Sequence, residues 1–142
     1  MDETEARRRL GEARVGRLAT VSAGGRPHVV PFVFAAHGDT LYWAVDRKPK
    51  RTRRLKRLDN IRANPRVEAV VDGYDEDWTR LWWVRATGTA RVVDDPGERT
   101  EALALLSRKY EQYRLQGPDG PVVAIDVQRW TGWAASGGIQ PG

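Results

Sequence analysis

Three strand-like segments follow one another near the start of the chain, and short turns join them. Val15–Ser22 alternates apolar residues with small or polar ones, and Pro27–Ala36 follows a glycine-containing turn at residues 23–25. Thr40–Val45 follows a second turn at residues 37–39. Alternation with a period of two is typical of half-buried strands, and short glycine-containing turns join antiparallel neighbours. The pattern therefore predicts consecutive hairpins. Pro31 cannot donate to a strand ladder, so we expect an edge or a bulge there.

The rest of the chain mixes helices and strands without the regular alternation of a parallel sheet. The predicted helices cover residues 3–13, 52–63 and 98–113, and the further strands cover 66–72, 78–93 with a kink at Gly88, and 122–130. Five to seven strands in 142 residues favour a mainly β fold, an antiparallel Greek-key barrel with helices packed outside it. We expect one domain over residues 1–136 and a mobile tail over 137–142.

A basic segment, Arg47–Arg57, joins the third predicted strand to the second predicted helix. Eight of its eleven residues are Lys or Arg, and the remainder of the chain holds more acidic than basic residues, so this segment accounts for the net charge of +5. The first N–H groups of a helix lack partners within the helix, and Lys50, Arg51 and Thr52 would add donors beside them. The segment therefore predicts an anion site or, alternatively, a solvated basic face.

Several kinds of protein are disfavoured by what the sequence lacks. Without cysteine there are no disulfides, thiolate metal sites or cysteine nucleophiles, and no apolar run approaches the roughly 20 residues that cross a bilayer. The N-terminus has no apolar signal core, so we expect a cytoplasmic protein. His28 and His37 do not have metal-ligand spacing, so no metal site is expected. Phosphate-loop, dinucleotide-binding and nucleophile-elbow motifs are missing as well.

A barrel with a basic strand-to-helix junction and six tryptophans suits a phosphate-bearing aromatic cofactor. Four segments in order resemble the pyridoxamine 5′-phosphate oxidase-like superfamily of split β-barrel flavin and deazaflavin binders. They are R-L-A-T-V with G-R-P-H-V-V-P-F (17–32), K-R-T-R-R-L followed by N-P (50–55 and 64–65), W-V-R-A-T-G-T-A (83–90), and R-W-T-G-W (129–133). Within the superfamily, the chain most resembles an actinobacterial class of probable coenzyme F420-dependent enzymes. The resemblance covers about residues 5–135.

This resemblance implies a homodimer with two cofactor sites, each built from both chains. The family's phosphate motif falls on residues 50–52, the strand beside the cofactor ring on 28–32, and the end of the next strand on 43–45. The implied cofactor contacts are Lys50, Arg51, Thr52, His28, Val30, Pro31, Phe32, Trp43, Ala44, Val45, Trp83 and Trp133. No catalytic side chain is assigned, because the reduced cofactor itself delivers hydride in such enzymes.

One departure from the family bears on the choice of cofactor. Flavin-binding oxidases place a glutamine in the strand where this chain has Trp83, and tryptophan cannot make the polar contact of that glutamine. The basic residues beyond Thr52, among them Arg57, would meet the anionic tail of coenzyme F420, or are simple surface charge. We therefore expect an oxidoreductase that uses F420 on a small organic substrate, with an FMN-dependent reductase or oxidase of the same fold as the alternative.

Two alternatives of other classes remain. The basic segment suits a nucleic-acid-binding module, although it lacks the interspersed aromatic residues of single-strand binders. A non-catalytic carrier or sensor of a flavin or haem is the other.

Overall fold

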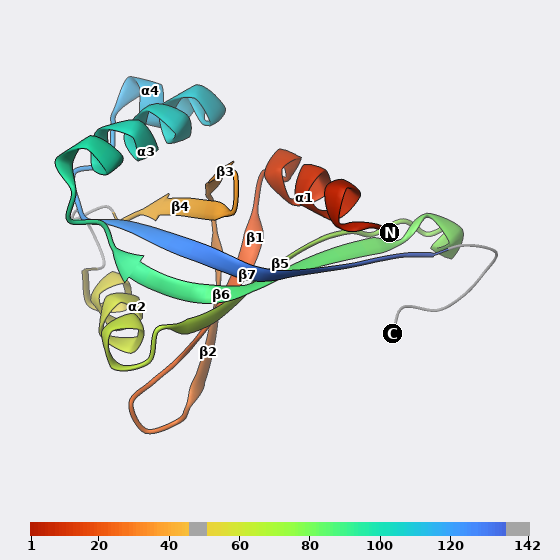
Figure 1. Ribbon diagram of the computed structural model, residues 1–142, viewed down its shortest axis with the longest axis horizontal. Helices are drawn as coiled ribbons and strands as arrows, with labels where there is room; N and C mark the ends of the chain where they lie inside the picture. The colour runs from red at the N-terminus through yellow and green to blue at the C-terminus, as the bar shows by residue number, and fades with distance from the viewer. Residues whose placement is uncertain (46–50, 136–142) are drawn as a thin grey trace.

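A computed structural model describes residues 1–45 and 51–135, with the side chains of all of these except 51–55. Seven strands form one curled sheet in the order β2-β1-β5-β6-β7-β4-β3, and every pair of neighbours in it is antiparallel (Figure 1). The strands are β1 (Gly16–Val21), β2 (Pro27–Phe32), β3 (Ala35–His37), β4 (Thr40–Ala44), β5 (Arg66–Gly73), β6 (Trp82–Val92) and β7 (Val122–Ala134). The helices are α1 (Glu3–Glu12), α2 (Arg51–Ala63), α3 (Pro96–Lys109) and α4 (Glu111–Leu115). The predicted fold class is confirmed. The predicted tail at 137–142 lies outside the described residues.

The first predicted hairpin forms as expected, and β2 lies at the edge of the sheet, where Pro31 needs no ladder partner on its outer side. The second predicted strand, however, is two strands. The backbone leaves the ladder at Val33 and Phe34, and the Phe34 N–H donates to the hydroxyl of Tyr110 at 3.1 Å. The Tyr110 hydroxyl lies 2.9 Å from the carbonyl oxygens of both Phe34 and Arg14, and it donates to one of them at a time. At residues 33–34, which separate β2 from β3, the backbone is therefore hydrogen-bonded to a side chain and not to a neighbouring strand.

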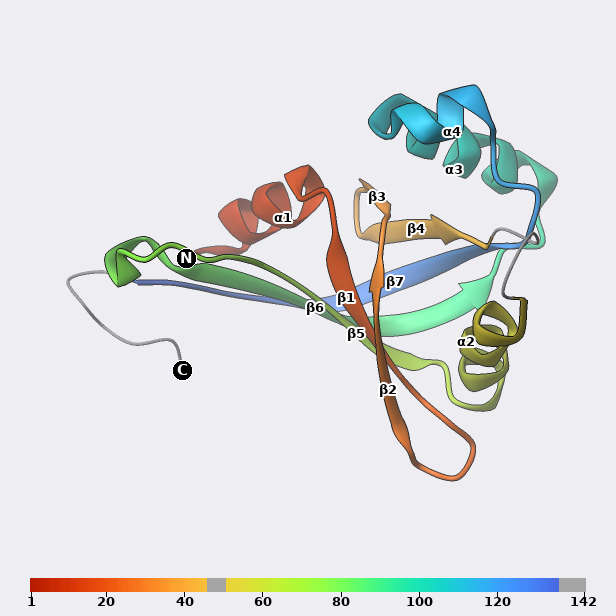
Figure 2. The ribbon, with the colours of Figure 1, turned by 180° about the vertical axis from the view of Figure 1, so that it is seen from behind.

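Strands β6 and β7 form a long ribbon that reaches well beyond the barrel (Figures 1 and 2). The predicted kink at Gly88 is a register shift between Thr87 and Gly88 in the pairing with β7. The predicted start of this strand at Trp78 is wrong. Residues 78–80 form a 3-10 turn because the Asp77 carboxylate accepts hydrogen bonds from the backbone N–H and the hydroxyl of Thr79. At the other end β7 continues past the predicted Trp130 to Ala134, which pairs with Trp82.

The helices lie around the barrel and close its core. Helix α1, capped by Asp2, buries Ala6 and Leu10 in the main core, and α2 adds Leu58 and Ile61. Helices α3 and α4 cover a second core under β3 and β4. The predicted helix 98–113 is interrupted at Tyr110, whose backbone is extended. That break places the Tyr110 hydroxyl on the β2–β3 junction. No helix in the described part of the chain is long and apolar enough to cross a bilayer.

A charged cluster fastens α3 to the sheet. Arg91 on β6 donates two hydrogen bonds of 2.9 Å to Glu98 and one of 2.7 Å to Asp126 on β7. The hydroxyl of Tyr42 on β4 donates to Glu98 at 2.8 Å. The hydrogen bonds from Arg91, and then the one from Tyr42, lower the pKa of Glu98 to about 2 from its ordinary 4.5. The ionised carboxylate therefore stabilises the fold.

Because the folded-state pKa of Glu98 is lowered, its contribution to stability is complete above pH 4.5 and is lost as the pH falls towards 2. We expect Glu98→Gln to reduce the free energy of unfolding by about 1–3 kcal/mol at pH 7, since it removes charge-assisted hydrogen bonds. Urea unfolding at pH 7 and at steps below pH 4.5 checks this. The wild type and the variant should converge as the pH falls, and a difference that stays constant with pH would contradict the assignment.

Candidate functional site

A cleft of about 290 Å³ opens where β2, β4, α2 and α4 come together. Most of the side chains that line it are apolar or aromatic, and the described lining residues are Val15, Pro31, Phe32, Val33, Trp43, Ala44, Arg57 and Tyr113. Four of the cofactor contacts implied by the sequence therefore meet here, although they come from two strands that are not neighbours in the sheet. The cleft adjoins α2, the helix that begins in the basic segment.

Arg57 and Trp43 form the polar part of this cleft. The Arg57 guanidinium carbon lies 4.9 Å from the centre of the Trp43 ring, which is a cation–π distance. Trp43 is 1% exposed, and its indole N–H has no hydrogen-bond partner. Arg57 is half-buried and lines the cleft, which favours a role in binding over simple surface charge for this residue.

The β2–β3 junction supports the cleft from behind. The Phe32 ring, which lines the cleft, stacks on the fully buried Phe34 ring with 4.9 Å between their centres. Lys109 on α3 lies over the Phe34 ring and donates hydrogen bonds to the carbonyl oxygens of Gly11 and Phe34. Burial, and then the nearby charge of Arg14, lower the pKa of Lys109 to about 8. These contacts fix the position of Phe32.

His28 lies further along β2, where α2 packs on the hairpin. It is paired in register with Thr20, whose buried hydroxyl accepts a hydrogen bond of 3.1 Å from the Asn60 amide. The Nδ1 atom of His28 is buried and has no hydrogen-bond partner. Val30 and Val45 also face the core, and Val45 is 3% exposed.

Two further predicted contacts, Trp83 and Trp133, are not at the cleft. Trp83 and Trp133 face each other across β6 and β7, but Trp133 is ten residues along β7 from Val123, the partner of Trp43. That is roughly 33 Å in an extended strand. Lys50 lies outside the described residues, as do the side chains of Arg51 and Thr52 at the start of α2. The histidine, aspartate and glutamate residues that the structure describes form no group of three or more able to hold a metal ion.

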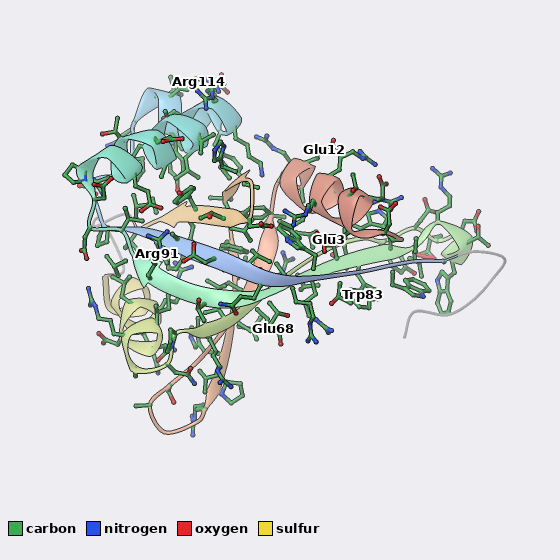
Figure 3. The ribbon with its side chains drawn as sticks, viewed as in Figure 1. Glu3, Glu12, Glu68, Trp83, Arg91 and Arg114 are labelled. Carbon is green, nitrogen blue, oxygen red and sulfur yellow. The ribbon has the colours of Figure 1, made fainter. Side chains whose placement is uncertain are left out.

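Trp83 belongs to an open face of the sheet. Figure 3 shows Trp83 and Glu68 on the side of the ribbon away from α1. Glu68 accepts a 2.8 Å hydrogen bond from the Thr87 hydroxyl and lies 3.3 Å from Arg85, whose guanidinium lies over the Trp83 ring. A hollow of about 540 Å³ extends over the same strands. Trp82 points the opposite way, to the core, and is covered by Arg9 of α1.

Comparisons with known proteins agree with this architecture. The family model described as pyridoxamine 5′-phosphate oxidase matches residues 2–134. A FAD-binding protein from Mesorhizobium loti is 26% identical, with a TM-score of 0.71 and coverage of 93% of this chain and 94% of its own. A conserved hypothetical protein from Mycobacterium tuberculosis is 21% identical, with a TM-score of 0.77 and coverage of 94% and 85%.

A heme binding protein from Mycobacterium smegmatis shares the fold as well. It is 20% identical, with a TM-score of 0.76 and coverage of 94% of this chain and 54% of its own. The comparison with curated proteins gave no match.

Proposed function

Since this chain belongs to the pyridoxamine 5′-phosphate oxidase family, we propose that it is an oxidoreductase that binds a flavin-type cofactor between the cleft and the basic start of α2. The observation that carries the proposal is the cleft itself. Proline and aromatic walls offer contact to a planar ring, and Arg57 supplies positive charge at its side. The buried N–H of Trp43 and the buried Nδ1 of His28 lack partners, as expected of groups that contact a ligand. These residues fit a flavin or a deazaflavin.

The chemistry divides between the cofactor and the chain. A flavin or deazaflavin supplies hydride transfer when bound. The part of the protein is to bind the phosphate at residues 50–52, to hold the ring against Pro31 and Phe32, and to keep water away with the apolar wall. The acceptor is a small organic molecule. The predicted cytoplasmic location stays a prediction.

The choice of cofactor rests on three observations that do not all point in the same direction. We propose coenzyme F420 first, because Trp83 replaces the flavin-contacting glutamine and because Arg57 lies at the cleft beyond the phosphate motif. The FAD-binding relative from Mesorhizobium loti favours a flavin such as FMN or FAD as the second candidate.

Calorimetric titration of the purified protein with F420, FMN, FAD and haem tests the function. Tight binding of F420 with weaker binding of FMN is the expected result. Stoichiometric FMN that stays bound through dialysis would reverse the order of the two cofactors. Binding of haem alone would overturn the oxidoreductase proposal in favour of a carrier.

We also propose that two chains share each site. Within one chain, Trp83 and Trp133 lie far from the cleft. Both tryptophans are half-buried on the open face of the sheet, which also carries polar residues. A two-fold partner that packs on this face would bring these tryptophans to a second cleft, with an interface above about 2,000 Å² for an obligate dimer.

Light scattering at micromolar concentration is expected to give twice the chain mass. Trp83→Glu places a charge in the proposed interface and should yield monomers, because an unpaired buried charge is costly. Leu115→Glu is the control, since Leu115 is 77% exposed on α4. A wild-type monomer would contradict both the dimer and the shared site.

A further inference from the structure

The indole N–H of Trp43 is a buried donor without a partner. Its ring is 1% exposed, it lies within the main core, and its Nε1 atom has no hydrogen-bond acceptor. Native proteins satisfy most buried donors, because a donor that has lost water and gained nothing destabilises the fold. By contrast, the N–H of the half-buried Trp130 is satisfied, since it donates to Asp39 at 3.1 Å. Trp43 therefore requires an explanation.

The surroundings of Trp43 define what would satisfy it. Trp43 lines the cleft, and the Arg57 guanidinium lies over its ring. Among the lining residues that the structure describes, none is acidic, and the others are apolar or aromatic. A donor and a cation in an otherwise apolar cleft attract an acceptor oxygen, above all one with negative charge. Because the Trp43 indole is buried, such a contact is stronger than one on the surface.

We propose that the Trp43 N–H donates a hydrogen bond to an oxygen of the molecule bound in the cleft, and that Arg57 balances the charge of that oxygen. The ligand is thus planar or apolar in its body, with a carbonyl or anionic oxygen at its inner edge. The inference rests on the proposed function for the identity of the ligand. The oxygen belongs either to the cofactor ring or to an aromatic carboxylate that occupies the cleft as substrate.

A comparison of two tryptophan variants tests this role. Trp43→Phe removes the N–H group together with the pyrrole half of the indole, so it also leaves a cavity in the core. We expect the variant to unfold at a lower temperature than the wild type without ligand, because the cavity outweighs the removal of an unsatisfied donor. It should bind the ligand roughly tenfold more weakly, because one hydrogen bond to a polar or charged oxygen is lost.

Trp130→Phe is the matched control. It makes the same chemical change at an indole whose N–H is satisfied by Asp39, on β7 and outside the residues that line the cleft. This variant should unfold at a lower temperature than the wild type and should bind ligand unchanged. Both tryptophan variants are therefore expected to lower the unfolding temperature, and only Trp43→Phe is expected to weaken binding.

The experiment measures thermal unfolding of the ligand-free variants and calorimetric binding of F420, FMN and benzoate. Weaker F420 or FMN binding by Trp43→Phe assigns the oxygen to the cofactor, and weaker benzoate binding alone assigns it to a substrate. A wild type that binds benzoate but neither cofactor refutes the proposed function and leaves this inference to be decided by benzoate. Unchanged binding of every ligand that the wild type binds would overturn the inference.

Binding by Trp130→Phe that is weakened as much as binding by Trp43→Phe would overturn it as well, because the loss would then follow from the missing ring and not from the N–H group at the cleft. If Trp43→Phe does not fold, Arg57→Gln decides. This change removes the charge beside the oxygen, so a loss of binding of about tenfold supports the inference, and unchanged binding refutes it.

Discussion

Replacement of Phe34 by alanine is expected to lower the free energy of unfolding by about 3–5 kcal/mol, the usual range for a large aromatic residue lost from a core. Phe34 is completely buried, and its ring lies between Phe32 and the ammonium group of Lys109. Gly16 lies beside the ring and has no side chain that could fill the space. Urea unfolding at neutral pH measures the change.

Leu115→Ala serves as the control for Phe34→Ala. Leu115 is 77% exposed, so its loss should alter the free energy of unfolding by less than about 0.5 kcal/mol. Phe34→Leu keeps most of the apolar volume and should recover much of the loss. If Phe34→Ala costs no more than Leu115→Ala, then the β2–β3 junction does not contribute to the core in the way described.

The second large effect concerns binding. Arg51→Ala is expected to weaken cofactor binding tenfold to a hundredfold, because a hydrogen bond to a charged group contributes about 1.5–3 kcal/mol. Thr52→Val keeps the shape, removes one hydroxyl and should cost less. Both residues lie in the first turn of α2, so we expect neither change to unfold the protein. Calorimetric titration with F420 and FMN measures both.

Lys56→Ala is the appropriate control for Arg51→Ala. Lys56 belongs to the same basic segment, yet it is exposed and is not among the residues lining the cleft. Arg57 would be a poor control, since it lies in the cleft over Trp43. Equal losses for Arg51→Ala and Lys56→Ala would mean that α2 acts through diffuse positive potential. No loss for either would remove the phosphate site from the proposal.

The sequence predicted those parts of the fold that depend on neighbouring residues. The β1–β2 hairpin and the register shift at Gly88 follow from local alternation, turn residues and the lack of a side chain. The separation of β2 from β3 could not be predicted in this way. It depends on the hydroxyl of Tyr110, which is 76 residues away in the chain and hydrogen-bonded to Phe34. The same contact interrupts the helix that helical spacing made continuous.

The sequence predicted which segments contribute to the candidate site, but not how these segments are arranged in space. The family resemblance placed Pro31, Phe32 and Trp43 in one site, and the structure brings them together. Arg57 lines the cleft because of the face that α2 turns to the barrel. The sequence could not predict that face, because a run of basic residues has the same composition on every face of a helix. Helical spacing from Leu103 and Leu106 places Tyr113 on the apolar face of the helix predicted over residues 98–113, although nothing in that pattern separates a core residue from one that lines a cleft.

The position of β7 has a consequence for how the protein comes to be made. Strand β7, the last strand in the described part of the chain, lies between β6 and β4 in the sheet, and β4 and β6 are not paired to each other. Until residues 122–134 emerge from the ribosome, β2-β1-β5-β6 and β4-β3 are two separate partial sheets. The edges of β6 and β4 then have no partner strand. Leu41 must then find Ile125 across most of the chain, and such distant pairings slow folding. Synthesis thus leaves a late interval in which these edges are open to other chains.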